Sequence, residues 1–306
     1  MVTRSALIYL SQREGLKEFA SRFRPFKKLT TRFVAGETIE EAVEAIRLIS
    51  ADGCTASFDH LNESVTGQAE AEAEVREYLQ ILKQIDDTGI HSNVSIKLTQ
   101  FGLEIDPELA YQNARRVVED AARRGNFVRV DMEGSNVTQA TLDVFKRLRG
   151  EFGLNDVGVV LQSYLYRTLA DAQELLKLPA RIRICKGAYN EPPEVAYPGK
   201  KDVDENYVRV MKLLLSSGIY HGIATHDPKM IDATIDHAQK EGIGKEAFEF
   251  QMLYGVRRDL QTRLAREGYN MRVYVPYGKH WYPYFMRRLA ERPANIWFVM
   301  RNLLKG

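Results

Sequence analysis

The sequence predicts an α/β protein built as a closed (β/α)8 barrel. Short runs of β-branched and apolar residues alternate with helical segments that have recognisable caps, and eight such units follow one another along the chain. Eight units in roughly 250 residues are typical of this barrel. A doubly wound open sheet is the alternative, but it rarely reaches eight units with such regularity.

The predicted strands are short and spread along the chain. They are CTASFD (54–59), NVSIKL (93–98), FVRVDM (127–132), VGVVLQ (157–162), RIRICKG (181–187), HGIATH (221–226), FEFQML (248–253) and MRVYVP (271–276).

Several of the helical segments begin with recognisable N-terminal capping residues. Thr38 and Glu41 form a capping box on the amphipathic segment TIEEAVEAIRLIS, which Gly53 closes. Asp106 and Asp227 each precede a proline, which is favoured at the first position of a helix.

Composition and charge exclude several classes of protein. The chain has 306 residues, 44% hydrophobic and 27% charged, which allows a sizeable core. A net charge of +2 argues against general nucleic-acid binding. Cys54 and Cys185 form neither a CxxC motif nor a metal-ligand spacing, so no metal site is predicted and a reducing cytoplasm is expected. No signal peptide is predicted, and no apolar run approaches the ~20 residues that span a bilayer.

The two ends of the chain differ from the predicted barrel. Residues 1–35 are predicted to form a basic helical arm, and residues 36–306 the barrel domain. The arm is interpreted either as a membrane-surface or partner-binding segment or as a solvated helical extension packed on the domain. The C-terminal segment NIWFVMRNLLKG is amphipathic and basic, and it either lies on lipid or packs against the barrel.

A polar or aromatic side chain stands at or near the end of every predicted strand. These residues are Asp59, Lys97, Asp131, Gln162, Lys186, His226, Gln251 and Tyr274. Core packing would not choose most of them, and in a (β/α)8 barrel the chemistry takes place at the carboxyl ends of the strands. We therefore expect the functional site at this face.

Several of these residues allow two interpretations. Alternation places Arg183 on the same strand face as Cys185. Arg183 either forms a salt bridge with Asp131 or serves as a functional cation in the barrel mouth. Lys97 and Asp131, on neighbouring strands, form either an ion pair or a substrate clamp. His226 in the motif THDP is either structural or catalytic. GIGKEA (242–247) follows a helix rather than a strand, so it predicts a turn and not a dinucleotide site.

The segment after the last strand contains an adjacent arginine pair, Arg287 and Arg288, within YVPYGKHWYPYFMRRLAERPAN (274–295). A helix that starts near Trp281 would place Tyr284, Arg288 and Glu291 on one face. Guanidinium forks held by a glutamate make a bidentate site for a carboxylate, and nearby tyrosines supply a flat apolar wall.

Seven segments occur in an order that resembles the proline dehydrogenase family. They are KLTQFGLEID, RVDMEG, VLQSYLYRT, KGAY, ATHDP, EFQMLYGV and YVPYG…YPYFMRRLAERP, and the resemblance runs from about Phe33 to the C-terminus. The chain resembles the stand-alone bacterial form, because no aldehyde dehydrogenase module follows.

The resemblance implies a distorted barrel that binds FAD, with the last barrel helix over the mouth. It also implies oxidation of L-proline to Δ1-pyrroline-5-carboxylate by hydride transfer to FAD, with electrons passed to a membrane quinone. A separate pyrroline-5-carboxylate dehydrogenase would use the product. FAD is expected to be non-covalent, because no attachment motif is present. The expected location is the cytoplasm or the inner face of the cell membrane, and a homo-oligomer is left open.

The resemblance also assigns residues. Those that would hold the substrate carboxylate are Arg287, Arg288 and Lys97. Those that would line the pyrrolidine ring are Tyr274, Tyr284, Tyr189 and Leu253, and those that would orient the cations are Asp131 and Glu291. Arg183 would approach the flavin N5. The residues that would contact other parts of FAD are Gln162, Lys186, Gly187, Ala188, Thr225 and His226.

Two other functions remain open from the residues alone. A Schiff-base aldolase would use a lysine at a strand end, Lys97 or Lys186. A non-catalytic binding protein would use the basic arm, but it leaves the polar strand ends unexplained. Flavin absorbance favours the oxidoreductase, whereas borohydride trapping of substrate on lysine favours the aldolase.

Overall fold

The predicted barrel is present. The structure, a computed structural model, describes residues 30–62 and 64–291, and the side chains up to residue 288. Parallel strands close into a barrel in chain order. They are β1 (Thr55–His60), β2 (Ser92–Ile96), β3 (Val128–Val130), β4 (Val157–Gln162), β5 (Arg181–Cys185), β6 (His221–Ala224), β7 (Phe248–Leu253) and β8 (Asn270–Tyr277). Each predicted strand overlaps an observed one, so the barrel prediction is confirmed and the open sheet is excluded.

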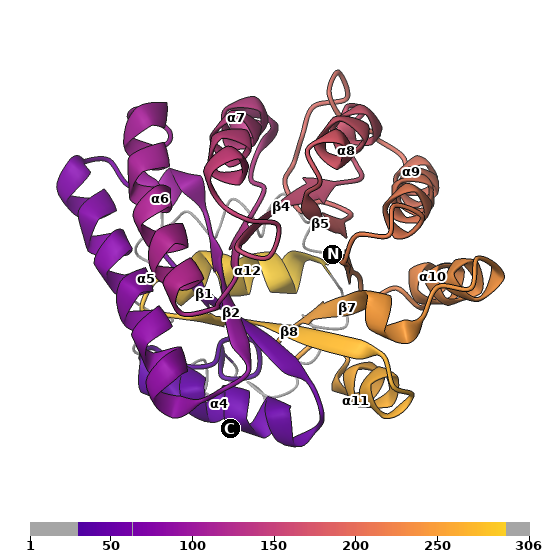
Figure 1. The fold of residues 1–306 in the computed structure, drawn as a ribbon, viewed down its shortest axis with the longest axis horizontal. Helices are drawn as coiled ribbons and strands as arrows, with labels where there is room; N and C mark the ends of the chain where they lie inside the picture. The colour runs from indigo at the N-terminus through magenta and orange to yellow at the C-terminus, as the bar shows by residue number, and fades with distance from the viewer. Residues whose placement is uncertain (1–29, 63, 292–306) are drawn as a thin grey trace.

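The helices that follow β1 to β7 form a ring outside the barrel (Figure 1). They are α5 (Gln68–Thr88), α6 (Pro107–Arg123), α7 (Ser135–Glu151), α8 (Thr168–Lys177), α9 (Lys200–Leu215), α10 (Pro228–Lys240) and α11 (Arg258–Arg266). Two 3-10 turns, η1 (Leu98–Phe101) and η2 (Lys245–Ala247), lie in the connections. The GIGKEA segment leads into η2, as the turn interpretation predicts.

The predicted helix caps are also present. Thr38 and Glu41 make a reciprocal capping box at the start of α4 (Ile39–Ala51). The carboxylates of Asp106 and Asp227 accept hydrogen bonds from backbone N–H groups in the first turns of α6 and α10. Each cap satisfies a donor that the helix itself leaves without a partner.

The last helix, α12 (Trp281–Glu291), does not join the outer ring. The place between β8 and β1 is taken by α4, which packs against both strands. α12 lies inside the ring of outer helices (Figure 1). The rings of Phe33 and Phe285 pack with centroids 6.1 Å apart. The segment before α4 also bonds to the end of β8, where the Ala35 N–H donates to the Pro276 carbonyl at 2.8 Å. These contacts hold α12 across the barrel, as the resemblance implies.

The barrel has an apolar outer layer and a polar interior. Outward-facing side chains such as Phe58 and Val159 are fully buried between strands and helices. Inside, the Arg272 Nε donates to both carboxylate oxygens of Glu249 at 3.0 and 2.9 Å. Gln251 lies within β7, and its amide donates to Glu249. Gln251 stands two residues before the end of β7 and contacts this interior layer through Glu249.

Among the helices between residues 30 and 291, none combines the length and the hydropathy needed to cross a bilayer. Most of the basic arm and the segment NIWFVMRNLLKG lie outside the described residues. Their interpretations stay predictions.

Candidate active site

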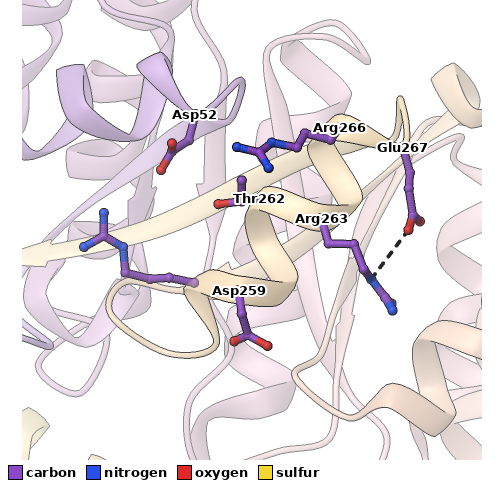
Figure 2. Close-up of a pocket in the computed structure, with 7 residues that line it drawn as sticks. Asp52, Asp259, Thr262, Arg263, Arg266 and Glu267 are labelled. Atoms are coloured by element: carbon purple, nitrogen blue, oxygen red, sulfur yellow. Dashed lines mark ion pairs between the residues drawn. The ribbon is translucent and has the colours of Figure 1, made fainter.

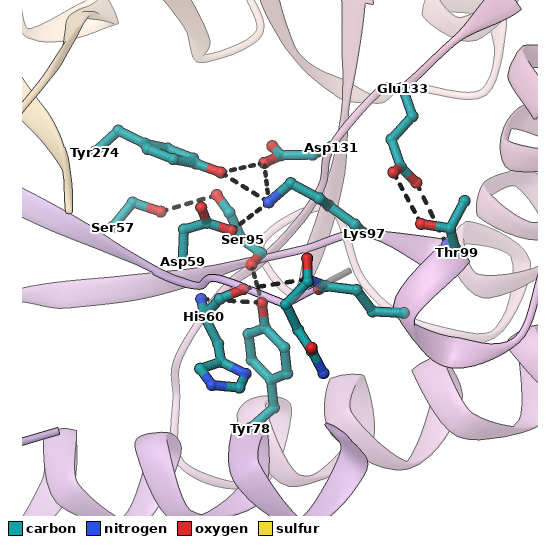
Figure 3. Close-up of polar contacts among 12 residues, drawn as sticks. Ser57, Asp59, His60, Tyr78, Ser95, Lys97, Thr99, Asp131, Glu133 and Tyr274 are labelled. Atoms are coloured by element: carbon teal, nitrogen blue, oxygen red, sulfur yellow. Dashed lines mark hydrogen bonds and ion pairs between the residues drawn. The ribbon is translucent and has the colours of Figure 1, made fainter. Parts of the chain in front are cut away.

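A buried ion pair links the ends of β1 and β2. The Lys97 Nζ donates to the carboxylate of Asp59, whose side chain is 1% exposed (Figure 3). The Asp131 carboxylate is 3.9 Å from the same ammonium group. The predicted pairing of Lys97 with Asp131 is therefore present, but Asp59 is the closer partner.

Asp131 connects three side chains across the mouth. Its Oδ1 accepts a hydrogen bond from the Arg183 Nη1 at 2.6 Å, and its Oδ2 accepts one from the Tyr274 hydroxyl at 2.7 Å (Figure 3). The Lys97 Nζ donates to the same tyrosine hydroxyl at 3.3 Å. Arg183 also donates to the Ser95 hydroxyl at 3.1 Å. The salt bridge between Arg183 and Asp131 is thus confirmed, and it lies within the predicted functional cluster.

These contacts fix the protonation states of two side chains. Burial alone would lower the pKa of Lys97, but the carboxylates of Asp59 and Asp131 raise it above its ordinary value. Burial and the neighbouring carboxylates of Asp131 and Asp59 raise the pKa of Tyr274 well above that of free tyrosine. The lysine stays cationic and the tyrosine stays a hydrogen-bond donor. A Schiff-base lysine needs a lowered pKa, which argues against Lys97 in that role.

The arginine pair lies on α12, which begins at Trp281 as predicted. Tyr284 and Arg288 are both buried, and the guanidinium carbon of Arg288 lies 5.1 Å from the centroid of the Tyr284 ring. This distance is typical of a cation–π contact and confirms that the two residues share one helix face. The Glu291 side chain lies outside the described residues, so its orienting role stays a prediction.

Tyr189 stands on the connection after β5, where charged groups of the barrel and of α12 influence its phenol. Burial and the Glu133 carboxylate raise the pKa of Tyr189 to about 12, whereas the charges of Arg287 and Lys97 act in the opposite direction. The phenol therefore lies within electrostatic range of one cation from α12 and another from β2. Lys97 and Arg287, two of the predicted carboxylate-binding residues, therefore both act on this side chain.

The predicted cofactor residues surround the ends of β4, β5 and β6. Gln162 is buried and donates to the Met132 carbonyl at 3.1 Å. Its Oε1 and the Nε of Arg183 are buried without a hydrogen-bond partner in the part of the chain that the structure describes. Buried polar atoms are normally satisfied, so both fit a polar ligand in the mouth.

Three other predicted cofactor residues have partners within the protein. Lys186 pairs with Asp204 at 2.5 Å and Asp227 at 2.7 Å. The Nε2 of His226 accepts a hydrogen bond from the Leu253 N–H at 2.9 Å, which supports a structural role for this nitrogen. Thr225 is buried, and its hydroxyl accepts from the Asp227 N–H at 3.1 Å.

The sequence interpretation missed several residues of the cluster. Asp59 was placed in the ring of strand ends but was given no role. Ser95, two residues before Lys97, also faces the interior, and strand alternation could have found it. Glu133 is held by the Thr99 hydroxyl at 2.8 Å (Figure 3), and no periodic signal marks it because it follows the strand.

A separate hollow of about 590 Å³ lies on the outer surface beside α11. Figure 2 shows its lining, in which Arg263 pairs with Glu267 at 3.6 Å. Asp52, which also lines it, stands before the start of β1, and Glu267 stands before the start of β8. The hollow is therefore at the amino-terminal end of the barrel, opposite the polar cluster.

Comparisons with known proteins agree with this geometry. The family model described as proline dehydrogenase matches residues 42–301. The chain is 44% identical to "Proline dehydrogenase" of Deinococcus radiodurans, over 99% of this chain and 98% of the relative. It is 42% identical to "Proline dehydrogenase 2" of Bacillus subtilis, with 100% of each covered.

Longer proteins contain a similar barrel. A crystal structure of proline utilization A (PutA) from Bdellovibrio bacteriovorus, inactivated by N-propargylglycine, matches with a TM-score of 0.81 and 26% identity. The match covers 87% of this chain but 33% of that one, so this chain spans about a third of the longer protein.

The fold, together with these matches, places the chain among the (β/α)8-barrel oxidoreductases. The chain belongs to the proline dehydrogenase family. Its resemblance to the stand-alone bacterial members is confirmed, because those relatives match over nearly their whole length.

Proposed function

We propose that this protein oxidises L-proline to Δ1-pyrroline-5-carboxylate with FAD held non-covalently at the barrel mouth. The observation that supports this most is the buried cluster at the barrel mouth, in which the Asp131 carboxylate accepts from Arg183 and Tyr274, and Lys97 donates to the same tyrosine hydroxyl. Cations from a strand end and from α12 would hold the carboxylate of a small amino acid, and the aromatic side chains would enclose its ring.

The chain's own groups are arranged to bind and orient such a substrate. Asp59 keeps Lys97 protonated, so the lysine offers a fixed positive charge. Asp131 fixes the Tyr274 hydroxyl, which holds the aromatic ring as a rigid wall. Holding the substrate at two points favours a near-attack geometry. Because the pKa of Lys97 is raised, this lysine is not the base that removes the amine proton.

Gln162 and Arg183 would hold the flavin, because each has a buried polar atom without a protein partner among the described residues. Lys186, Gly187, Ala188, Thr225 and His226 would contact other parts of the cofactor. When bound, FAD supplies the acceptor for the hydride from proline. The positive charge of Arg183 would stabilise an electron-rich, reduced flavin beside it.

The family resemblance supports the rest of the proposal. Electrons would pass to a membrane quinone, which requires contact between the protein and the inner face of the cell membrane. A separate pyrroline-5-carboxylate dehydrogenase would then use the product.

The arginine pair provides the test. Arg287→Met and Arg288→Met should each raise KM for proline and lower kcat/KM about tenfold to a hundredfold, because each removes a charged hydrogen bond. Flavin content, read from visible absorbance, should stay near the wild-type value. Arg258→Met, at an exposed position of α11, is the matched control.

A purely structural arginine pair predicts a different result. Melting temperature would then fall in both variants without a change in KM. A wild-type protein without flavin absorbance, or without absorbance bleaching by proline in the absence of oxygen, would refute the proposed function itself. Substrate trapped on a lysine by borohydride would support the aldolase instead.

A further inference from the structure

A single carboxylate fastens the connection between β5 and α9 to two neighbouring loops. The Glu191 Oε1 accepts hydrogen bonds from the Ser135 backbone N–H at 2.8 Å and from the Tyr164 hydroxyl at 3.2 Å. Its Oε2 accepts from the Ser135 hydroxyl. The donors belong to the start of α7 and to the connection after β4. Glu191 therefore joins three loops at the carboxyl end of the barrel.

Glu191 also completes the start of α7. The N-cap residue is Gly134, which has no side chain to cap the helix. The Glu191 carboxylate satisfies the backbone N–H of Ser135, the first residue of the helix. A negative charge is stabilised at a helix N-terminus, so the bond is favourable even though it comes from another loop.

Tyr164 holds the beginning of the same connection. Its backbone N–H donates to the Lys186 carbonyl at 3.0 Å, and its carbonyl accepts from the Tyr197 N–H at 2.8 Å. Its ring lies so close to Gly187 that a Cβ there would be 2.3 Å from a ring carbon. The connection is thus held on both sides of Tyr189. Before it, Lys186 bonds to Tyr164, and after it, Glu191 bonds to Ser135.

Tyr189 is the residue that this arrangement positions. It stands two residues before Glu191, on the connection between β5 and α9. Its phenol lies within electrostatic range of Glu133, Lys97 and Arg287, and the residue is 37% exposed. Without the Glu191 bonds, the segment between Gly187 and Pro192 would lose its attachment to α7.

We propose that Glu191 is a positioning residue that holds Tyr189 against the substrate ring. The inference rests on the proposed function, in which Tyr189 lines the proline site. Glu191 itself touches neither substrate nor cofactor in this proposal, and it acts through the loop that it fastens.

The test begins with Glu191→Gln. The amide keeps one acceptor oxygen, but its NH2 group then faces donors of Ser135 or Tyr164, so part of the attachment is lost. KM for proline should rise about threefold to tenfold, as expected for the loss of one or two hydrogen bonds. Tyr164→Phe, which removes one bond, should shift KM in the same direction by less. Glu194→Gln, at an exposed position of the same connection, should leave KM unchanged.

A double-mutant cycle separates positioning from general stability. In a Tyr189→Ala background, Glu191→Gln should raise KM no further, because the residue that it positions is gone. An equal rise in both backgrounds, or a lower melting temperature with unchanged KM, would overturn the proposal. If Glu191→Gln does not fold, Tyr164→Phe and Ser135→Ala carry the same cycle.

Hydrogen exchange distinguishes this proposal from the proposed function. The amides of residues 187–191 should exchange faster in Glu191→Gln than in the wild type, whatever reaction the protein catalyses. Unchanged exchange would refute the attachment. A wild-type protein that neither binds flavin nor oxidises proline would refute the proposed function and leave the exchange result intact.

Discussion

Asp131 is the centre of the charged cluster, and Asp131→Asn tests whether the cluster stabilises the barrel. The carboxylate accepts from Arg183 with one oxygen and from Tyr274 with the other. The amide keeps the shape of the side chain but offers one acceptor oxygen and no charge. Either the guanidinium or the phenol then faces an NH2 group.

The magnitude follows from burial. The side chains of Arg183 and Asp131 are 7% and 10% exposed, so water does not replace the lost bond. Removing one partner of a buried ion pair costs about 3–5 kcal/mol. Because the amide retains one hydrogen bond, we expect Asp131→Asn to lower the free energy of unfolding by about 2–4 kcal/mol.

Urea unfolding of the flavin-free protein, followed by circular dichroism, measures this loss. Asp259→Asn is the matched control, because Asp259 pairs with Arg257 at 3.0 Å but its side chain is 70% exposed. That surface pair should contribute less than about 1 kcal/mol. Equal losses in the two variants would refute the reasoning that burial makes the Asp131 contacts strong.

Three further outcomes are expected. Gly187→Ala should lower the free energy of unfolding by about 1–3 kcal/mol more than Gly218→Ala. Both glycines have positive φ, but a methyl group overlaps a neighbour only at Gly187. Equal losses in the two variants would contradict this. Burial, together with two nearby arginines, lowers the pKa of His221 from 6.5 to about 3. The unfolded chain therefore binds the extra proton between these pH values, and stability falls as pH falls by up to about 1.4 kcal/mol per unit. Urea titrations from pH 7 to 4 should show that the free energy of unfolding depends less steeply on pH in His221→Asn than in the wild type, and as steeply in His91→Asn. Identical slopes in the two variants would contradict the role of His221. Acid precipitation should release the flavin into solution; flavin that stays on the pellet would indicate a covalent bond.

Local patterns in the sequence were sufficient for the architecture. Strand runs recur eight times, and the caps at Thr38, Asp106 and Asp227 act on residues two or three positions away. Alternation along a strand also placed Arg183 toward the interior, where Asp131 meets it. These features depend on neighbours in the chain, so the sequence alone could predict them.

The tertiary structure decided which charged groups meet. Lys97 lies closer to Asp59 than to Asp131, although both carboxylates stand at the ends of neighbouring strands. The choice depends on strand register and on the direction of each side chain at the closed barrel mouth. Neither property has a period that the sequence displays.

The sequence by itself indicated the barrel, the family and the meeting of Lys97, Asp131 and Arg183 at the mouth. Only the folded chain revealed that α4 occupies the ring position that α12 leaves, and that Glu191 fastens the connection carrying Tyr189. The Glu191 partners stand 56 and 27 positions away along the chain. Such contacts arise when closure of the barrel brings the strand ends together, so their specificity lies in the three-dimensional arrangement and not in any local pattern of residues.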